Sequence, residues 1–329
     1  MHLKYLKHQE IDKEKWDRCL QQSPESVLYA CAFYLDIVAP NWCALVEENG
    51  DNYSIIIPLT TQKKYGITFL HQPLFCQQLG VFSVQLNILP IGQLLDIFFK
   101  HFAFASHYHF NIENTVSKSP KLSGDSHATH IVTHHTHLLS LKSPYATLYQ
   151  NYSLDRKKNL KRAKKANLKI IESDDIEPLI QMFEQDIAKK IQGGVAPNAY
   201  VLLRKIYAEL KKRQMCQLLY TQNAKQEINA GALFAFYQNK IIYLFNAAYD
   251  YARKENGRMF LIDYILKTHA NSDKIFDFES PEIEAIAYFY QSFGAEAAPY
   301  QVLSFNHLPS VVNWFWKIKK YLRNLMEII

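Results

Sequence analysis

The sequence predicts a mixed α/β (α+β) fold in which two similar units follow each other along the chain. At 329 residues, the chain is about twice as long as a typical domain of roughly 150 residues. In the second half, helical patterns precede three consecutive strand-like runs, after which helices and strands alternate. This order predicts mixed, largely antiparallel sheets rather than a doubly wound parallel sheet. The low glycine content, 10 residues, argues against glycine-rich nucleotide loops and against disorder.

The first half contains a small set of helix and strand patterns, which we assign to a domain over residues 1–141. Apolar spacing predicts helices over 11–20 and 89–105. Short apolar runs predict strands over 42–47, 53–59, 67–70 and 110–113. Residues 114–129 read as a polar loop, and residues 130–140 as the closing strand of this degenerate unit.

The second half shows a longer and more regular succession, which we assign to a domain over residues 142–309. It predicts helices over 154–167, 176–190, 198–213, 256–270 and 281–293. Strands are expected over 168–171, 274–278 and 300–305, and an antiparallel meander over 216–221, 230–237 and 241–247. This order resembles the acetyltransferase fold known as GNAT, so the whole chain is expected to hold two tandem GNAT-like domains.

Targeting and redox signals predict a cytoplasmic protein. The N-terminus has no apolar run of the signal-peptide kind, and no window reaches the ~18 apolar residues of a membrane-spanning helix. The five cysteines are scattered without a CxxC pair, which favours reduced thiols. His127, His130, His134, His135 and His137 lack neighbouring Cys or carboxylate ligands at the usual spacings, so no metal site is expected.

The densest charge in the chain lies in residues 156–165, which hold seven cations and no acid, whereas the whole chain carries only +6. Such a cluster repels itself unless an anion lies nearby. Helical spacing places several of these cations on one face, which can bind a diphosphate or a nucleic-acid backbone. The alternative is a solvated surface helix, but such helices usually interleave Glu with Lys. The predicted anion site comprises Arg156, Lys157, Lys158, Lys161, Arg162 and Lys165.

Two segments resemble the Fem-type aminoacyl transferases, which are tandem GNAT proteins that extend peptidoglycan stem peptides. The first is the passage Asn159-Leu-Lys-Arg-Ala-Lys-Lys followed by Asn167-Leu-Lys-Ile. The second is Phe276-Asp-Phe-Glu-Ser followed by Phe289-Tyr-Gln-Ser-Phe-Gly. The chain departs from the family pattern after the acidic segment, where Ser280-Pro281 follows directly and the family often has Gly. It also lacks the glycine loop that holds the pyrophosphate of acetyl-CoA, since AYDYARKENG stands in its place.

The resemblance implies transfer of an acyl or aminoacyl group to an amine of a phosphate-bearing acceptor, such as a peptidoglycan precursor. The donor would be aminoacyl-tRNA or acyl-CoA, and no tightly bound cofactor is expected. This chemistry needs a group that deprotonates the amine and donors at the developing oxyanion. Asp277 and Glu279 are the candidate carboxylates, against the alternative that they cap the following helix. Tyr243 and Tyr290 are candidate hydroxyl donors of the cleft, and Gln77 and Gln78 are candidate cleft residues from the first domain.

Other interpretations remain open. One is a GNAT-type N-acyltransferase that uses acyl-CoA, and another is a binding protein that keeps the fold without the chemistry. Residues 310–329 predict an amphipathic helix with flanking Lys and Arg, which suits docking on protein or peripheral contact with the inner face of a membrane.

Overall fold

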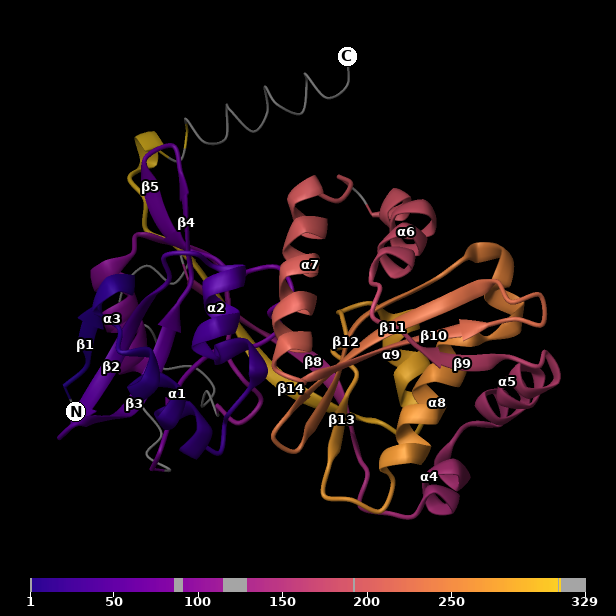
Figure 1. The fold of residues 1–329 in the computed structure, drawn as a ribbon. Helices are drawn as coiled ribbons and strands as arrows, with labels where there is room; N and C mark the ends of the chain where they lie inside the picture. Colours follow the sequence, from indigo (N-terminus) through magenta and orange to yellow (C-terminus); the bar gives the residue numbers. More distant parts are fainter. Residues whose placement is uncertain (1, 86–90, 115–128, 192, 313, 315–329) are drawn as a thin grey trace. The chain divides into compact units, whose positions relative to one another are not determined.

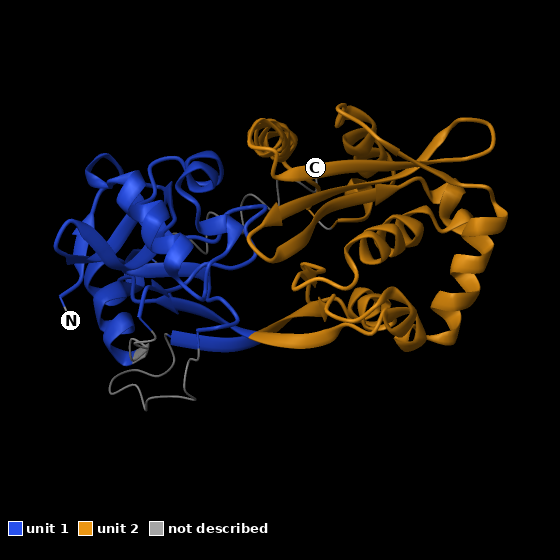
Figure 2. Ribbon diagram, turned by 60° about the horizontal axis from the view of Figure 1, so that its bottom comes forward, with its two compact units in different colours: residues 1–133, 300–329 blue, residues 134–299 orange. Residues whose placement is uncertain are grey.

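The chain forms two compact units in a computed structural model that describes residues 2–85, 91–114, 129–191, 193–312 and 314 (Figure 1 and Figure 2). Unit 1 comprises residues 1–133 and 300–329, and unit 2 comprises residues 134–299. Unit 2 is thus inserted in the sequence between two segments of unit 1. The predicted domains end after residues 141 and 309, whereas the compact units divide inside two strands that the chain uses to pass between them.

Unit 1 contains two sheets with helices and short 3-10 turns between their strands. The first sheet has the order β1-β2-β3-β6, and the second has the order β4-β5-β7-β14 in this unit. The elements are β1 (Lys4–Leu6), η1 (His8–Glu10), α1 (Lys13–Gln22), η2 (Leu28–Ala30), α2 (Ala32–Val38), β2 (Cys43–Asn49), β3 (Asn52–Leu59), β4 (Thr61–Lys64), β5 (Ile67–Leu70), β6 (Phe82–Ser83), α3 (Ile91–His101), β7 (Phe104–His109) and β14 (Glu296–Asn306).

The core of unit 1 is built around aromatic side chains. Trp16 and Trp42 are fully buried and meet edge to face, with ring centroids 4.6 Å apart. The indole N–H of Trp16 donates to the Ala30 carbonyl at 2.8 Å, and that of Trp42 donates to Asp36 at 3.0 Å. Both polar atoms of these large side chains are therefore satisfied, as burial requires.

Unit 2 carries the more regular succession of elements. They are β8 (Thr129–Ser140), α4 (Tyr145–Asn151), α5 (Leu154–Lys165), β9 (Lys169–Glu172), α6 (Glu177–Asp186), η3 (Ala188–Lys190), α7 (Pro197–Lys212), β10 (Cys216–Gln222), β11 (Ile228–Tyr237), β12 (Lys240–Ala248), η4 (Asp250–Glu255), α8 (Gly257–His269), β13 (Ile275–Asp277) and α9 (Glu284–Gln291). In this unit the strand order is β8-β13-β12-β11-β10-β9. The meander β10-β11-β12 is antiparallel, as predicted, and β12 pairs with β13 in parallel.

Two adjacent small residues of β11 show that helices cover both faces of this sheet. A Cβ on Gly231 would meet the Tyr220 ring and a methyl of Leu179 in α6. Its neighbour Ala230 points to the other face, where its Cβ would lie 2.7 Å from a Cβ on Gly257 of α8. Successive side chains of a strand alternate between faces, so α6 and α8 pack on opposite sides (Figure 1).

The structure corrects the predicted end of one helix in unit 1. The helix expected over residues 89–105 ends at His101, and Phe104–His109 form β7 instead of a strand over 110–113. This segment is a strand because it forms an antiparallel ladder with β14, and this pairing overrides the helical spacing of its apolar residues. Most of the predicted loop 114–129 and most of the C-terminal helix predicted over 310–329 lie outside the described residues.

Candidate functional site

The candidate site of unit 2 lies where β12 and β13 part. Their parallel pairing covers only Lys240–Ile242 with Ile275–Asp277, whereas β12 continues to Ala248. Beyond residue 242, this edge of β12 therefore has no β13 partner in the ladder. A cavity of about 470 Å³ occupies this position. Its lining comes from strand β12, from the end of α6, from the start of α8, and from the segment after β13 together with α9. The lining residues are Phe183, Ile187, Tyr243, Leu244, Phe245, Asn246, Arg258, Phe278, Glu279, Pro281, Ala285, Ile286, Phe289 and Tyr290.

Tyr243 and Tyr290, which the sequence suggested as cleft residues, both line this cavity. Tyr243 is 3% exposed, and its buried hydroxyl has no hydrogen-bond partner among the described residues. Burial raises the pKa of both tyrosines well above the usual value, while Arg258 lowers it in part. Both hydroxyls therefore stay protonated and can act as hydrogen-bond donors.

Glu279 lines the cavity, whereas Asp277 does not. Glu279 has a positive φ of 51°, which is unusual for a residue with a long side chain. Its backbone N–H donates to Asp277 Oδ1 at 2.9 Å, and the same oxygen accepts from the Thr136 hydroxyl at 2.8 Å. Burial raises the pKa of Asp277. Asp277 thus fixes the turn that carries Glu279, and Glu279 is the carboxylate that a bound molecule can meet.

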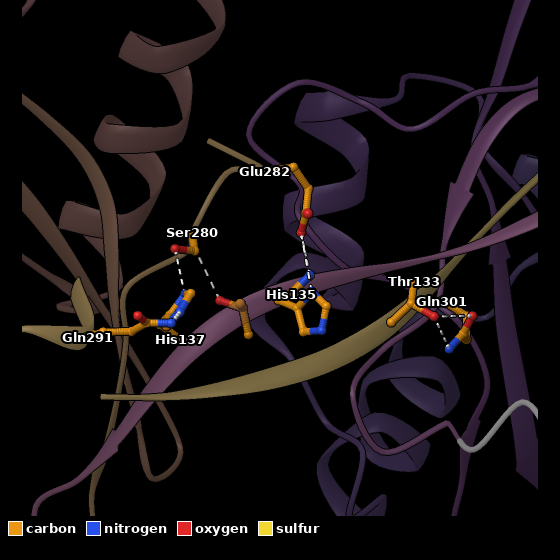
Figure 3. Close-up of polar contacts among 8 residues, drawn as sticks. Thr133, His135, His137, Ser280, Glu282, Gln291 and Gln301 are labelled. Atoms are coloured by element: carbon orange, nitrogen blue, oxygen red, sulfur yellow. Dashed lines mark hydrogen bonds and ion pairs between the residues drawn. The ribbon is translucent and has the colours of Figure 1, made fainter. Parts of the chain in front are cut away.

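A second set of contacts fixes the segment after β13 to strand β8 (Figure 3). His137 Nδ1 lies 2.8 Å from Ser280 Oγ, and His137 Nε2 lies 3.0 Å from Gln291 Nε2. Since the Gln291 amide donates, Nε2 accepts and Nδ1–H donates to Ser280, so the ring is neutral in this arrangement. Burial lowers the pKa of His137. Ser280 is only 1% exposed, which suits a positioning role and not that of a nucleophile.

Another histidine of the cluster, His135, makes separate contacts. His135 faces Glu282, which accepts from its backbone N–H and lies 3.9 Å from its ring, and His127 lies outside the described residues (Figure 3). In unit 1, the neighbouring Thr133 hydroxyl and the Gln301 amide are 3.1 Å apart. Within the described parts of the chain, no three His, Cys, Asp or Glu side chains come together as metal ligands would.

The basic run forms helix α5, as predicted. Ser153 caps its N-terminus by accepting from the Arg156 N–H at 3.2 Å, and Leu160 and Ala163 are buried on its inner face. Three cations lie in the last turn, where they interact favourably with the helix dipole. The cations Lys158, Lys161, Arg162 and Lys165 are exposed, and none of them forms an ion pair with another described residue.

Two members of the predicted anion site have other contacts. Lys157 donates to the Gln150 carbonyl at 2.8 Å. The guanidinium of Arg156 stacks over the rings of Phe289 and Phe293, at 4.6 and 5.9 Å from their centroids. Burial lowers the pKa of Arg156. Phe289 lines the cavity, so Arg156 connects the N-terminal end of α5 with a wall of the site, although no α5 residue lines the cavity itself.

Gln77 and Gln78 belong to unit 1 and hold its loops together. The Gln78 amide donates to Gln77 Oε1 at 3.0 Å and accepts from the Ile112 N–H at 3.1 Å. The Gln77 carbonyl lies 2.8 Å from His109 Nδ1. Gln78 is only 3% exposed. Within unit 1, both residues therefore connect neighbouring loops by hydrogen bonds.

Arg258 is the lining residue that sequence reasoning missed. It follows Gly257 at the start of α8, and its Nη1 donates to Asn246 Oδ1 at 3.3 Å. A Cβ on Gly257 would lie 2.5 Å from Thr221 Oγ1, so glycine lets α8 approach the sheet closely. Asn256 precedes it with φ 61°, and no side chain caps the helix. No local sequence pattern marks Arg258, because the packing of α8 on the sheet is what places it at the cavity.

No known protein family matches the sequence, and no curated protein matches it either. Solved structures do share the fold. FemX superposes with a TM-score of 0.60 at 12% identity, covering 96% of this chain and 99% of that chain. A tandem GNAT protein from the clavulanic acid biosynthesis pathway gives 0.55 at 11% identity, with 94% and 100% covered. The C-terminal domain of a putative lysylphosphatidylglycerol synthetase from Agrobacterium fabrum gives 0.52 at 12%, with 91% and 92% covered.

These likenesses define the class of fold. The chain has the tandem GNAT fold, which confirms the fold predicted from the order of its elements. The same arrangement is present in FemX, in agreement with the Fem-type resemblance of the two sequence segments. In the described part of the chain, no helix combines the length and apolar content needed to cross a membrane.

Proposed function

We propose that this protein is an acyl- or aminoacyltransferase that acylates an amine in the cavity of unit 2. The observation that carries the proposal is the cavity itself, where one carboxylate, Glu279, and the hydroxyls of Tyr243 and Tyr290 meet aromatic walls. The tandem GNAT fold supports it, since solved proteins of this fold include FemX and a GNAT protein. Peptidoglycan precursors remain the expected acceptors on the Fem-type resemblance.

The reaction joins the amine nitrogen to the acyl carbon and breaks the bond from that carbon to the donor oxygen or sulfur. The amine must lose a proton, and the Glu279 carboxylate in the cavity is the group that accepts it. The Tyr290 hydroxyl supplies a donor for the carbonyl oxygen as negative charge develops there. The departing alkoxide or thiolate of the donor takes up this proton from Glu279, which restores the carboxylate. Asp277 contributes by holding the turn of Glu279.

The exposed cations of α5 are proposed to hold the phosphate of one reactant. They carry charge that no described acid neutralises, and charge-assisted hydrogen bonds to phosphate are strong. An aminoacyl-tRNA donor fits a helix face with many cations. Acyl-CoA, which also carries phosphates that these cations can bind, is a second candidate donor.

Replacing Glu279 by Gln tests the chemical role directly. We expect product formation to fall about 100-fold or more, because the amide cannot accept the amine proton, while donor binding persists. The measurement is mass spectrometry of the full chain incubated with amine acceptors and either aminoacyl-tRNA or acyl-CoA. Glu282→Gln is the matched control, since Glu282 is an exposed carboxylate of the same segment that does not line the cavity. Equal loss in both variants would remove Glu279 from the mechanism.

Reversing two charges of α5 tests the phosphate assignment. In Lys161→Glu/Arg162→Glu, we expect thermal stabilisation by tRNA or CoA to disappear while folding is retained, because both side chains are exposed and outside any described ion pair. Lys63→Glu/Lys64→Glu, in exposed residues of unit 1, makes the same change in net charge as a control. For tRNA, log affinity should also fall linearly with log salt. A response to anionic ligands that survives in the α5 variant refutes the assignment. Binding of every donor without product in any pairing would favour the non-catalytic alternative.

A further inference from the structure

Two polar groups in the cavity of unit 2 still have donors to offer. The Tyr243 hydroxyl is buried without a hydrogen-bond partner among the described residues. The Arg258 guanidinium donates to Asn246, but it forms no ion pair within the part of the chain that the structure describes. Both groups line the same cavity. The lining thus includes a cation and a neutral hydrogen-bond donor. A buried donor without a partner lowers the stability of the folded protein unless a ligand accepts its hydrogen bond.

The chemistry of these two groups selects a carboxylate. A guanidinium has five N–H donors in a planar fork that matches the two oxygens of a carboxylate, and a tyrosine hydroxyl can add a further hydrogen bond. The Tyr243 hydroxyl stays protonated because burial raises its pKa. Most of the remaining lining is apolar, and it includes the aromatic residues Phe245 from β12 and Phe278 after β13. An apolar body attached to a carboxylate therefore fits better than a hydrated anion.

The cavity also holds one carboxylate of its own, Glu279, which attracts an ammonium group. Glu279, from the segment after β13, and Arg258, at the start of α8, both line this cavity, so it contains one group of each charge. Its volume of about 470 Å³ is in the range of small-molecule sites, roughly 300–1,000 Å³. A zwitterion with an apolar side chain matches the charges and the walls together.

We propose that the cavity binds the acceptor as a free α-amino acid with an aromatic or other large apolar side chain. Its carboxylate lies on Arg258 and Tyr243, and its amine lies toward Glu279, where the proposed acyl transfer takes place. This inference rests on the proposed function. It replaces the peptidoglycan precursor, expected from the resemblance alone, with a free amino acid as the acceptor, so the phosphate belongs to the donor. An aminoacyl ester has no free carboxylate, so this site distinguishes the acceptor from an aminoacyl donor.

Titration calorimetry of the full chain without any donor tests the proposal. L-phenylalanine should bind at least about tenfold more tightly than phenethylamine, which lacks the carboxylate, and than hydrocinnamate, which lacks the amine. In Arg258→Gln and in Tyr243→Phe, phenylalanine and hydrocinnamate should weaken about tenfold, whereas phenethylamine should not change. Arg253→Gln, at an exposed arginine of η4 outside the lining, should leave all three affinities unaltered.

Arg258→Lys keeps the charge and serves as the variant of choice if Arg258→Gln does not fold. It should retain more affinity for phenylalanine than the Gln variant. Equal binding of phenylalanine and phenethylamine, or no binding of any amino acid, overturns the proposal. That result would leave the transferase assignment standing if the full chain still acylates other amines. Binding of phenylalanine without any product would support the site and count against the proposed function.

Discussion

The Tyr243 hydroxyl is a single polar group that affects both the stability of the protein and the proposed ligand binding. It is buried and has no hydrogen-bond partner within the described residues. On folding it therefore loses the hydrogen bond that it makes to water in the unfolded chain. A side chain of this kind is expected to persist only where it serves another purpose. Tyr152, by contrast, donates to Asp263 at 3.1 Å and is satisfied.

Tyr243→Phe should therefore raise the free energy of unfolding by about 1 kcal/mol, because it removes a buried donor that lacks a partner. Urea denaturation without ligand measures this difference. Tyr152→Phe is the matched control and should lower the free energy of unfolding by about 1 kcal/mol, since it removes a hydrogen bond to a buried carboxylate. A destabilised Tyr243→Phe protein would mean that the hydroxyl is satisfied in solution.

The sequence could propose Glu279, Tyr243 and Tyr290 because they lie in patterns that carry chemistry, and all three line one cavity. It could not rank them against Asp277, because burial behind a turn depends on the Thr136 contact from a distant strand. Arg258 was missed for a similar reason. An isolated arginine at a helix start has no local signature, and only packing of α8 on the sheet places it at the cavity.

At the scale of elements, α8 lies close to the meander because its first residue has no side chain. Gly257 meets Thr221 of β10 and Ala230 of β11 at distances that a Cβ could not tolerate. This close packing of α8 on the sheet positions Arg258, the next residue, at the cavity. The α8 sequence is apolar nearly all round, with buried residues on several faces, which fits a helix between the sheet and α5.

Gly257→Ala should lower the free energy of unfolding by about 1–3 kcal/mol, because the added methyl overlaps atoms of two strands. Gly92→Ala, in α3 of unit 1, is a control for which we expect the free energy of unfolding to rise instead of fall. A Cβ there meets no atom within 4 Å, so alanine should stabilise that helix by about 0.5–1 kcal/mol. Thermal and urea unfolding of the two variants would show the contrast. Equal effects would contradict the packing argument.

Local patterns predicted most elements of unit 2 because its helices and strands are long and periodic. They did less well in unit 1, where the segment after His101 continues a helical apolar spacing yet forms β7. That strand exists because β14, nearly 200 residues later, supplies its ladder. A pairing over such a separation leaves no trace in local periodicity.

Across the whole molecule, buried histidine makes stability depend on pH. Burial lowers the pKa of His137 in the folded state below the usual value of about 6.5. Above that pH both states hold the ring neutral, and its contribution is complete. As the pH falls below it, the unfolded chain binds the proton first, so the free energy of unfolding decreases.

We therefore expect urea unfolding between pH 7.5 and pH 5.5 to show a loss of stability that is smaller in His137→Gln than in the native protein. The substitution removes the titrating ring from both states. His130→Gln, at an exposed position of the same strand, should follow the native profile. Identical slopes for all three proteins would show that His137 does not contribute to the acid sensitivity.

The insertion of unit 2 into the sequence of unit 1 has a consequence for how the protein is made. A ribosome releases residues 1–133 long before residues 302–306, which pair with β7. Until then the nascent first unit carries an unpaired strand edge that can recruit other chains. A gene fragment cut at a conventional domain border would keep that edge open for good, so the first unit can be studied in isolation only if its last strand is joined on by a designed linker.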